Sequence, residues 1–162
     1  MRASSACPPR PHHRHILWSW IGGFLGIATT GYLSHVTHSP LLMASFGATC
    51  VLAFGVPDSP LAQPRNIIGG HFLSTLLGLI FLHLFGSTWW GMALAVATAI
   101  GCMQFTKTVH PPAGADPLIV MTTGASWKFL VTPALAGAII LVICAIVFNN
   151  LAEDRSYPKY WL

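Results

Sequence analysis

Two short segments interrupt the long apolar stretches of this sequence, and they hold most of the residues that could bind a solute. They are SFGA, residues 45–48, and HPPAGA, residues 110–115. Glycine and alanine let a solute approach the backbone. A helix that begins at such a segment also presents unpaired amide hydrogens and a positive dipole end, which suits an anion. The candidate binding residues are Ser45, Phe46, Gly47, Ala48, Arg65, Asn66, Lys107, His110, Pro111, Pro112, Gly114 and Asp116.

Two of these candidates, His110 and Asp116, have two interpretations each, and Asn66 has one. His110 precedes two prolines and either bonds a loop carbonyl or binds a solute or proton. Asp116 precedes a proline, a pattern that predicts a helix N-cap. An ionised carboxylate there would repel an anion, so the alternative role for Asp116 is to carry a coupled proton. Asn66 begins a predicted helix and is expected to cap it.

The remaining polar residues allow simpler interpretations. Arg65 and Lys107 either orient the chain in a membrane or attract an anion to the site. His71 and His83 lie on one predicted helix, where we expect them to pack or to lie at a membrane interface. The histidines of PHHRH, residues 11–15, are not expected to bind a metal.

The sequence carries no sign of an enzyme or of a nucleic-acid-binding protein. It has no G-x-S-x-G or H-E-x-x-H motif and no acidic pair within helical reach, so we expect no catalytic residue and no cofactor. The formal charge of +4 is mostly terminal, which indicates membrane topology and not nucleic-acid binding. The four cysteines are far apart and form no C-x-x-C pair, so they are expected to be packing residues.

The composition is that of an integral membrane protein. Only 7% of the residues are charged and 54% are hydrophobic, whereas soluble domains carry about 25% charged residues. No Asp, Glu, Lys or Arg occurs between Arg14 and Asp58, from Asn66 to Thr106, or from Phe129 to Ala152. Each gap exceeds the ~20 apolar residues that cross a hydrocarbon core. We therefore predict an all-α polytopic membrane protein of one domain.

The expected elements are four long transmembrane helices and two short, broken membrane segments. The long helices are predicted at 16–34, 67–85, 89–105 and 129–150, and the broken segments at 40–57 and 110–123. Pro111 and Pro112 exclude a continuous helix because proline lacks the amide hydrogen and clashes with the preceding turn. Ser39-Pro40 and Asp116-Pro117 each read as an N-cap followed by a first helical position.

The two halves of the chain resemble one another, which suggests an internal repeat. A cytoplasmic tail, residues 1–15, precedes a single transmembrane domain, 16–150, with repeat-like halves 16–85 and 89–150 and a tail at 151–162. If both broken segments cross the membrane, Lys128 is the one cation opposite the N-terminus. The positive-inside rule favours that arrangement, in which the halves form an inverted repeat as in many transporters. If both segments re-enter instead, Arg65 and Lys107 also lie opposite the N-terminus.

The run TVHPPAGA, residues 108–115, together with SFGA and SPLAQPRN, residues 59–66, resembles the HPP family of integral membrane proteins. The resemblance implies a small multi-helix transporter, and some plant and cyanobacterial members are implicated in nitrite transport. We therefore expect a carrier or channel for a small inorganic anion such as nitrite. The alternatives are a cation or neutral-solute carrier that uses Asp116 and backbone carbonyls, or a scaffold subunit without transport.

The expected surroundings follow from the membrane assignment. The partners would be the lipid bilayer, a small inorganic ion or solute, and further copies of the chain in a homo-oligomer. The expected location is a bacterial inner membrane with both termini in the cytoplasm.

Overall fold

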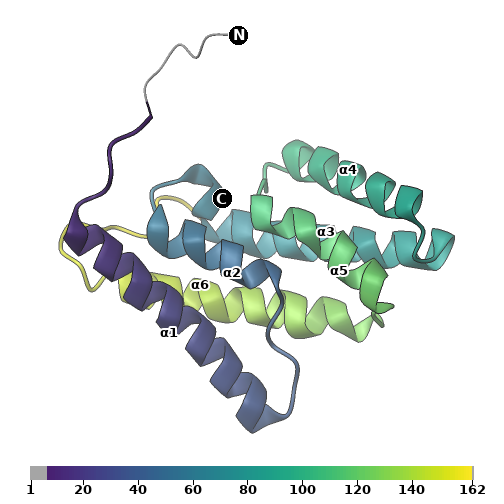
Figure 1. The fold of residues 1–162 in the computed structure, drawn as a ribbon, viewed down its shortest axis with the longest axis horizontal. Helices are drawn as coiled ribbons and strands as arrows, with labels where there is room; N and C mark the ends of the chain where they lie inside the picture. The colour runs from purple at the N-terminus through teal and green to yellow at the C-terminus, as the bar shows by residue number, and fades with distance from the viewer. Residues whose placement is uncertain (1–6, 162) are drawn as a thin grey trace.

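The structure, a computed structural model, describes residues 7–161, and all regular structure in that range is helical (Figure 1). The α-helices are α1 (His13–Thr37), α2 (Ser45–Cys50), α3 (Pro64–Phe85), α4 (Trp89–Phe105), α5 (Asp116–Thr123) and α6 (Ala136–Asn149). Four shorter helical segments are η1 (Val51–Gly55), η2 (Pro60–Ala62), η3 (Pro111–Ala115) and η4 (Leu130–Leu135). The first residues of the predicted N-terminal tail, 1–6, lie outside the described range.

Three helical stretches are long and apolar enough to cross a membrane: His13–Thr37, Pro64–Phe85 and Leu130–Asn149. The sequence predicted four long helices. The fourth, α4, has the predicted bounds but only 17 residues, and it falls with Ser45–Gly55 among the shorter apolar helices. The last span is interrupted near its start, because Thr132 has an extended backbone (φ −132°, ψ 122°) before Pro133. The chain is thus an integral membrane protein by helix length and composition.

The first broken segment starts later than the sequence predicted. Ser39 does not cap a helix at Pro40, and α2 begins at Ser45. The backbone here is tied to the end of α1, because the Ser34 hydroxyl donates to the Ser39 carbonyl and accepts from the amide of Leu41. These two bonds hold the chain in a loop, so the prediction of a cap at Ser39 was wrong.

The first broken segment runs antiparallel to α1 along most of its length (Figure 1). It starts beside the end of α1, at Ser34, and continues from α2 into the π-helical turn η1. It finishes beside the start of α1, where His15 Nε2 lies 2.8 Å from the Gly55 carbonyl oxygen and Ser19 donates to the Phe54 carbonyl over 2.9 Å. The segment therefore does not return to the end of the molecule from which it started.

The second broken segment also connects the two ends of the molecule. Its start lies beside the beginning of α3, since His110 Nδ1 is 2.8 Å from the Leu61 carbonyl oxygen. It then continues through η3 and α5, whose last residues precede Trp127. The Trp127 ring lies 5.6 Å from that of His83, near the end of α3. Both broken segments thus extend from one end of the helical bundle to the other.

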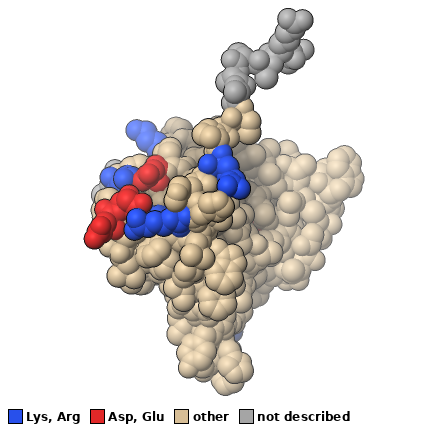
Figure 2. Space-filling view, turned by 60° about the vertical axis from the view of Figure 1, so that its left-hand side comes forward, with Lys and Arg blue, Asp and Glu red and all other residues tan. Residues whose placement is uncertain are grey.

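Charged side chains gather at one end of the molecule, as one face shows in Figure 2. We call it the charged end; it holds the starts of α1 and α3 and the ends of α4 and α6. Arg155 donates to the Phe54 carbonyl there, and Lys159 pairs with Asp58 over 2.9 Å. Burial lowers the pKa of Arg155, against the opposing effect of Asp154 and Asp58. Lys128 follows Trp127 at the opposite end.

The apolar core lies between the first broken segment, α1 and α6. Phe46 and Phe54 point into it and are fully buried. Glycines on the neighbouring helices make room for these rings. A Cβ built on Gly26 would lie 2.9 Å from the Phe54 ring, and one on Gly137 would overlap the Phe46 ring. The core therefore holds the SFGA segment against α6.

Candidate functional site

A cluster of hydrogen-bonded polar side chains is enclosed where the two broken segments meet α3. We call it the buried polar cluster; it consists of Ser45, Thr49, His71, Thr75, His110 and Asp116. Ser45 is 4% exposed and the other five are 0% exposed. SFGA and α2 supply two members, α3 supplies two, and HPPAGA with the first residue of α5 supplies two. Segments far apart in sequence thus converge on one polar centre.

Asp116 is one end of this cluster. Its Oδ1 atom accepts a hydrogen bond from Ser45 Oγ over 2.7 Å. Its Oδ2 atom lies 2.7 Å from His71 Nδ1 and accepts from Thr75 Oγ1 over 3.2 Å. The predicted helix cap is wrong, because the N-cap of α5 is Ala115 and the carboxylate binds donors on α2 and α3 instead of its own helix. Asp116 therefore joins three elements.

Two imidazole rings and one hydroxyl continue the cluster toward the charged end. His71 Nε2 lies 2.8 Å from Thr49 Oγ1, and His110 Nε2 lies 3.0 Å from the same oxygen. The other nitrogen of His110, Nδ1, faces the Leu61 carbonyl in η2. His110 thus bonds a loop carbonyl, one of its two interpretations, and also belongs to an unbroken chain of hydrogen bonds that ends at Asp116.

The helices α2 and α5 both begin at this cluster. Ser45 is the first residue of α2 and Asp116 the first residue of α5, so their hydrogen bond joins two helix N-termini. From there the chain of α2 and η1 runs to the charged end and α5 runs to the opposite end. Each helix N-terminus carries roughly half a positive charge. The starts of both helices therefore lie beside the carboxylate.

Small residues of α3 bring its backbone against the HPPAGA segment. A Cβ on Gly70 would lie 2.7 Å from His110 Cβ, and one on Gly78 would lie 2.7 Å from the Pro117 Cα atom. Ser74 donates to the Ala113 carbonyl over 2.6 Å. Because larger residues would push HPPAGA away from α3, these positions set the distance between His71 and His110.

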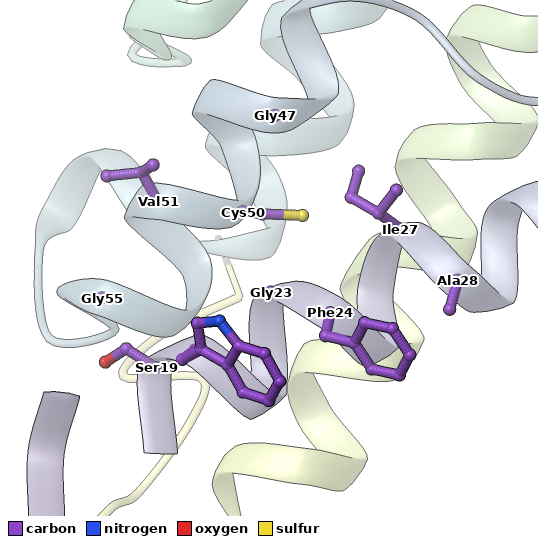
Figure 3. A pocket seen from close by; sticks show the side chains of 10 residues that line it. Ser19, Gly23, Phe24, Ile27, Ala28, Gly47, Cys50, Val51 and Gly55 are labelled. Atoms are coloured by element: carbon purple, nitrogen blue, oxygen red, sulfur yellow. The ribbon is translucent and has the colours of Figure 1, made fainter. Parts of the chain in front are cut away.

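The outer face of the SFGA helix borders a groove against α1 (Figure 3). The groove has a volume of about 690 Å³ and is almost entirely apolar. Gly47 and Cys50 lie on one side of it and Gly23 and Phe24 on the other, as Figure 3 shows. Gly47 is thus on the surface and not in the buried polar cluster.

A second groove separates the two broken segments and has a volume of about 630 Å³. Ala48 and Val51 line one wall, and Pro111 and Pro112 line the other. Ser45 borders this groove and also donates to Asp116. A small hydroxyl therefore separates the groove from the buried carboxylate.

The other predicted site residues lie around the cluster. The rings of Phe46 and His71 lie edge to face, with centroids 5.1 Å apart. Gly114 is half-buried in η3. At the charged end, Arg65 donates to the Thr106 carbonyl over 2.9 Å, and Lys107 is exposed beside it.

Asn66 does not cap α3, so that prediction was wrong. The helix begins at Pro64 and its N-cap is Gln63. The Asn66 amide instead donates to the Val109 carbonyl over 2.9 Å, directly before His110. Its role is to hold the start of the second broken segment against α3.

Sequence reasoning missed three members of the cluster. His71 was expected to pack or lie at an interface, and Thr49 and Thr75 were not selected. A signal was present, because Thr49 follows Ser45 by one helical turn and His71, Thr75 and Gly78 fall on one face of α3. His83, in contrast, is exposed at the opposite end beside Trp127. In the described range, no three His, Cys, Asp or Glu residues come together as a metal site.

Comparison with known proteins places these observations in a family. A transmembrane protein of Dictyostelium discoideum is 42% identical over 95% of this chain and 58% of its own length. A second from the same organism is 39% identical over 95% of the chain and 53% of its length, so the chain spans little more than half of these relatives. No solved structure matches. The family model described as "HPP, transmembrane region" matches residues 8–158, and the chain belongs to this HPP family of membrane proteins.

Proposed function

We propose that this protein transports a small inorganic anion across a membrane, with nitrite as the first substrate to test. The observation that carries the proposal is the meeting of two broken segments at a buried polar cluster. Irregular backbone at membrane depth is tolerated where it is enclosed by protein or lines a wet cavity. In transporters, substrate and ion sites are typically formed by such interrupted helices.

The burial of ionisable groups supports transport over a purely structural role. Asp116, His71 and His110 are all 0% exposed within the helical bundle. A charged group in the membrane costs at least ~2.5 kcal/mol, and such groups commonly mark ion pathways and proton relays. A packed apolar core would hold these helices together without that cost.

Two features support an anion as the solute. The N-termini of α2 and α5 direct positive dipole ends toward the cluster. Arg65 and Lys107 lie at the charged end near the start of the HPPAGA segment, where they would raise the local anion concentration. The second groove, between the broken segments, is the proposed route toward Ser45.

The same geometry supports a membrane topology for the proposal. With six crossings, the charged end and both tails would face the cytoplasm of a bacterial inner membrane, in accord with the positive-inside rule. The halves 16–85 and 89–150 would form an inverted repeat, with α2 and α5 as equivalent broken helices. We also propose that several copies of the chain assemble into a homo-oligomer.

Nitrite uptake by purified protein in liposomes tests the function. His110→Ala should lower the uptake rate by about tenfold or more, since it removes a link in the polar cluster. His83→Ala is the matched control and should transport like the parent, because His83 is exposed at the opposite end. Arg65→Ala should lower uptake mainly at low salt, where charge steering is strong. Absence of any anion flux in the parent protein would refute the proposal.

A carrier for a cation or a neutral solute is the second candidate, and one observation favours it. Asp116 has no Lys or Arg partner among its hydrogen bonds and ion pairs in the described chain. Its carboxylate could therefore bind a cation directly. Asp116→Asn separates the two candidates in a counterflow assay, where labelled and unlabelled solute exchange without a net driving force. Anion exchange should survive the substitution, whereas cation exchange should be abolished.

A further inference from the structure

The hydrogen positions in the buried polar cluster follow from its donors and acceptors. The Leu61 carbonyl can only accept, so His110 Nδ1 carries a hydrogen. Both oxygens of the Asp116 carboxylate already accept hydroxyl hydrogens, Oδ1 from Ser45 and Oδ2 from Thr75. An ionised carboxylate only accepts, so His71 Nδ1 also carries a hydrogen.

With both Nδ1 atoms protonated, the two Nε2 atoms are left to Thr49. A neutral imidazole has one hydrogen, so each Nε2 would then be an acceptor. Both face the Thr49 hydroxyl, at 2.8 Å and 3.0 Å, and that hydroxyl has one hydrogen to donate. Its third contact, to the Ser45 carbonyl, is longer at 3.3 Å. If both rings are neutral, the lone pair of one Nε2 atom therefore faces a lone pair of the Thr49 oxygen inside a fully buried site.

We propose that the buried polar cluster is a proton-binding site that holds one additional proton, and that Thr49 relays this proton between His71 and His110. With the proton on His71, its Nε2–H donates to Thr49 and the Thr49 hydroxyl donates to His110. With the proton on His110, both of these hydrogen bonds reverse direction. Every short contact in the cluster is satisfied in either form.

The relay step conserves atoms and charge. The Nε2–H bond of His71 breaks and its proton passes to the Thr49 oxygen. At the same time the original Thr49 hydroxyl proton passes to His110 Nε2, so His71 becomes neutral and His110 becomes an imidazolium. The Thr49 hydroxyl now donates to His71 Nε2 and accepts from His110 Nε2–H, which is the second of the two forms. No other reactant is needed.

The surroundings give the relay a direction. No Lys or Arg side chain bonds to the cluster in the described chain, and the remaining group that faces His71 is the apolar ring of Phe46. Of the cluster members, His110 lies nearest the charged end. Its Nδ1 atom bonds the carbonyl of Leu61, a residue that is partly exposed there. A proton would thus move between the Asp116–His71 pair inside the molecule and His110 toward the charged end.

Coupling of this proton to solute movement rests on the proposed transport function. A deprotonated cluster retains the negative charge of Asp116, which opposes an incoming anion. The additional proton cancels that charge and leaves the two positive helix ends uncompensated. Anion entry would therefore be favoured when the proton is bound, which is the requirement for moving the two together.

The proton-binding site can be tested without any transport measurement. In protein with 15N-labelled histidine, the ring signals of His71 and His110 are assigned with the variants His71→Gln and His110→Gln. At about pH 8.5, some two units above the ordinary histidine pKa, we expect a hydrogen on Nε2 of one of these two rings. Two neutral rings that both carry hydrogen at Nδ1 alone would overturn the proposal, whether or not the protein transports nitrite.

The relay is tested with two substitutions at Thr49. Thr49→Val removes the hydroxyl at nearly constant volume, and the proton uptake that accompanies nitrite uptake should fall at least about tenfold, the scale of one lost relay step. Thr49→Ser keeps the hydroxyl and should retain coupled uptake. Thr30→Val is the matched control, because Thr30 is equally buried but bonds the Gly26 carbonyl of its own helix.

The outcomes separate the two proposals. Unchanged proton uptake in Thr49→Val would overturn the relay while leaving anion transport intact. A proton on Nε2 in a protein that moves no anion would support the proton site and refute the proposed transport function. If Thr49→Val does not fold, Thr49→Ala removes the same hydroxyl and tests the relay, while the labelled histidine spectra of the parent decide the proton site.

Discussion

The contact of Gly137 with the SFGA segment yields a prediction whose size follows from the structure. Gly137 is buried in α6, directly opposite Phe46. A Cβ at this position would overlap the Phe46 ring and lie 2.5 Å from the Leu41 carbonyl oxygen. The ring could turn aside, but the carbonyl belongs to the backbone and cannot move without displacing the segment before α2.

The expected cost of Gly137→Ala is the balance of two effects. Overpacking of a filled core costs about 1–3 kcal/mol. Because one of the two clashes is with backbone, we take the upper part of that range, and replacing glycine by alanine in a helix returns about 0.5–1 kcal/mol. The net loss is about 2 kcal/mol, which corresponds to a melting temperature lower by roughly 4–8 °C for a chain of this size.

Thermal unfolding in detergent micelles measures this loss, with Gly23→Ala as the control. Gly23 lies in α1 and a Cβ there would meet nothing within 4 Å, so the same substitution should keep only the helix gain of about 0.5–1 kcal/mol and raise the melting temperature slightly. Adding Phe46→Leu to Gly137→Ala should recover only part of the loss, because the clash with Leu41 remains. Equal melting temperatures for the Gly137 and Gly23 variants would refute the packing argument.

Two further substitutions probe the cluster and the charged end. Gly70→Ala should reduce nitrite uptake at temperatures where the protein is still folded, because its Cβ would lie 2.7 Å from that of His110 and shift the His110 ring from Thr49. A lower melting temperature with unchanged uptake would contradict this. Tyr157→Phe should cost about 1 kcal/mol, since the buried hydroxyl donates to the Ala62 carbonyl over 2.7 Å. Burial raises the pKa of Tyr157, so the parent should be stabilised below the ordinary tyrosine value of ~10 and lose that stability above it, whereas Tyr157→Phe should show a shallower decline in an unfolding series at alkaline pH.

Much of the helical pattern could be predicted because it depends on local chemistry. The long gaps without charge predicted the membrane helices, the bounds of α4 agree with the prediction, and α5 ends at Thr123, where the second broken segment was expected to end. The break at Pro111-Pro112 follows from the missing amide hydrogens. The helix break at Thr132 was not predicted, although Pro133 was visible in the sequence.

The cap predictions failed because they assumed that a short polar side chain bonds its own helix. Asp116 and Asn66 lie in the first turns of α5 and α3, yet their side chains bond other segments of the chain, whereas the Ser39 hydroxyl donates to the nearby Thr37 carbonyl at the end of α1. Long-range contacts of this kind leave no local signature. The same reason hid Thr49, since its importance comes from His71 and His110, which reach it from elsewhere in the sequence.

If the protein carries an anion as proposed, the opposed directions of α2 and α5 also bear on whether that transport can be reversed. The positive ends of both helices lie at the centre, while their negative ends lie toward opposite surfaces. An ion entering from either surface therefore meets a similar sequence of backbone dipoles. These dipoles would therefore not make an ion current larger in one direction than in the other. Net flow would follow the concentration gradients and the voltage, and it should reverse when they are reversed.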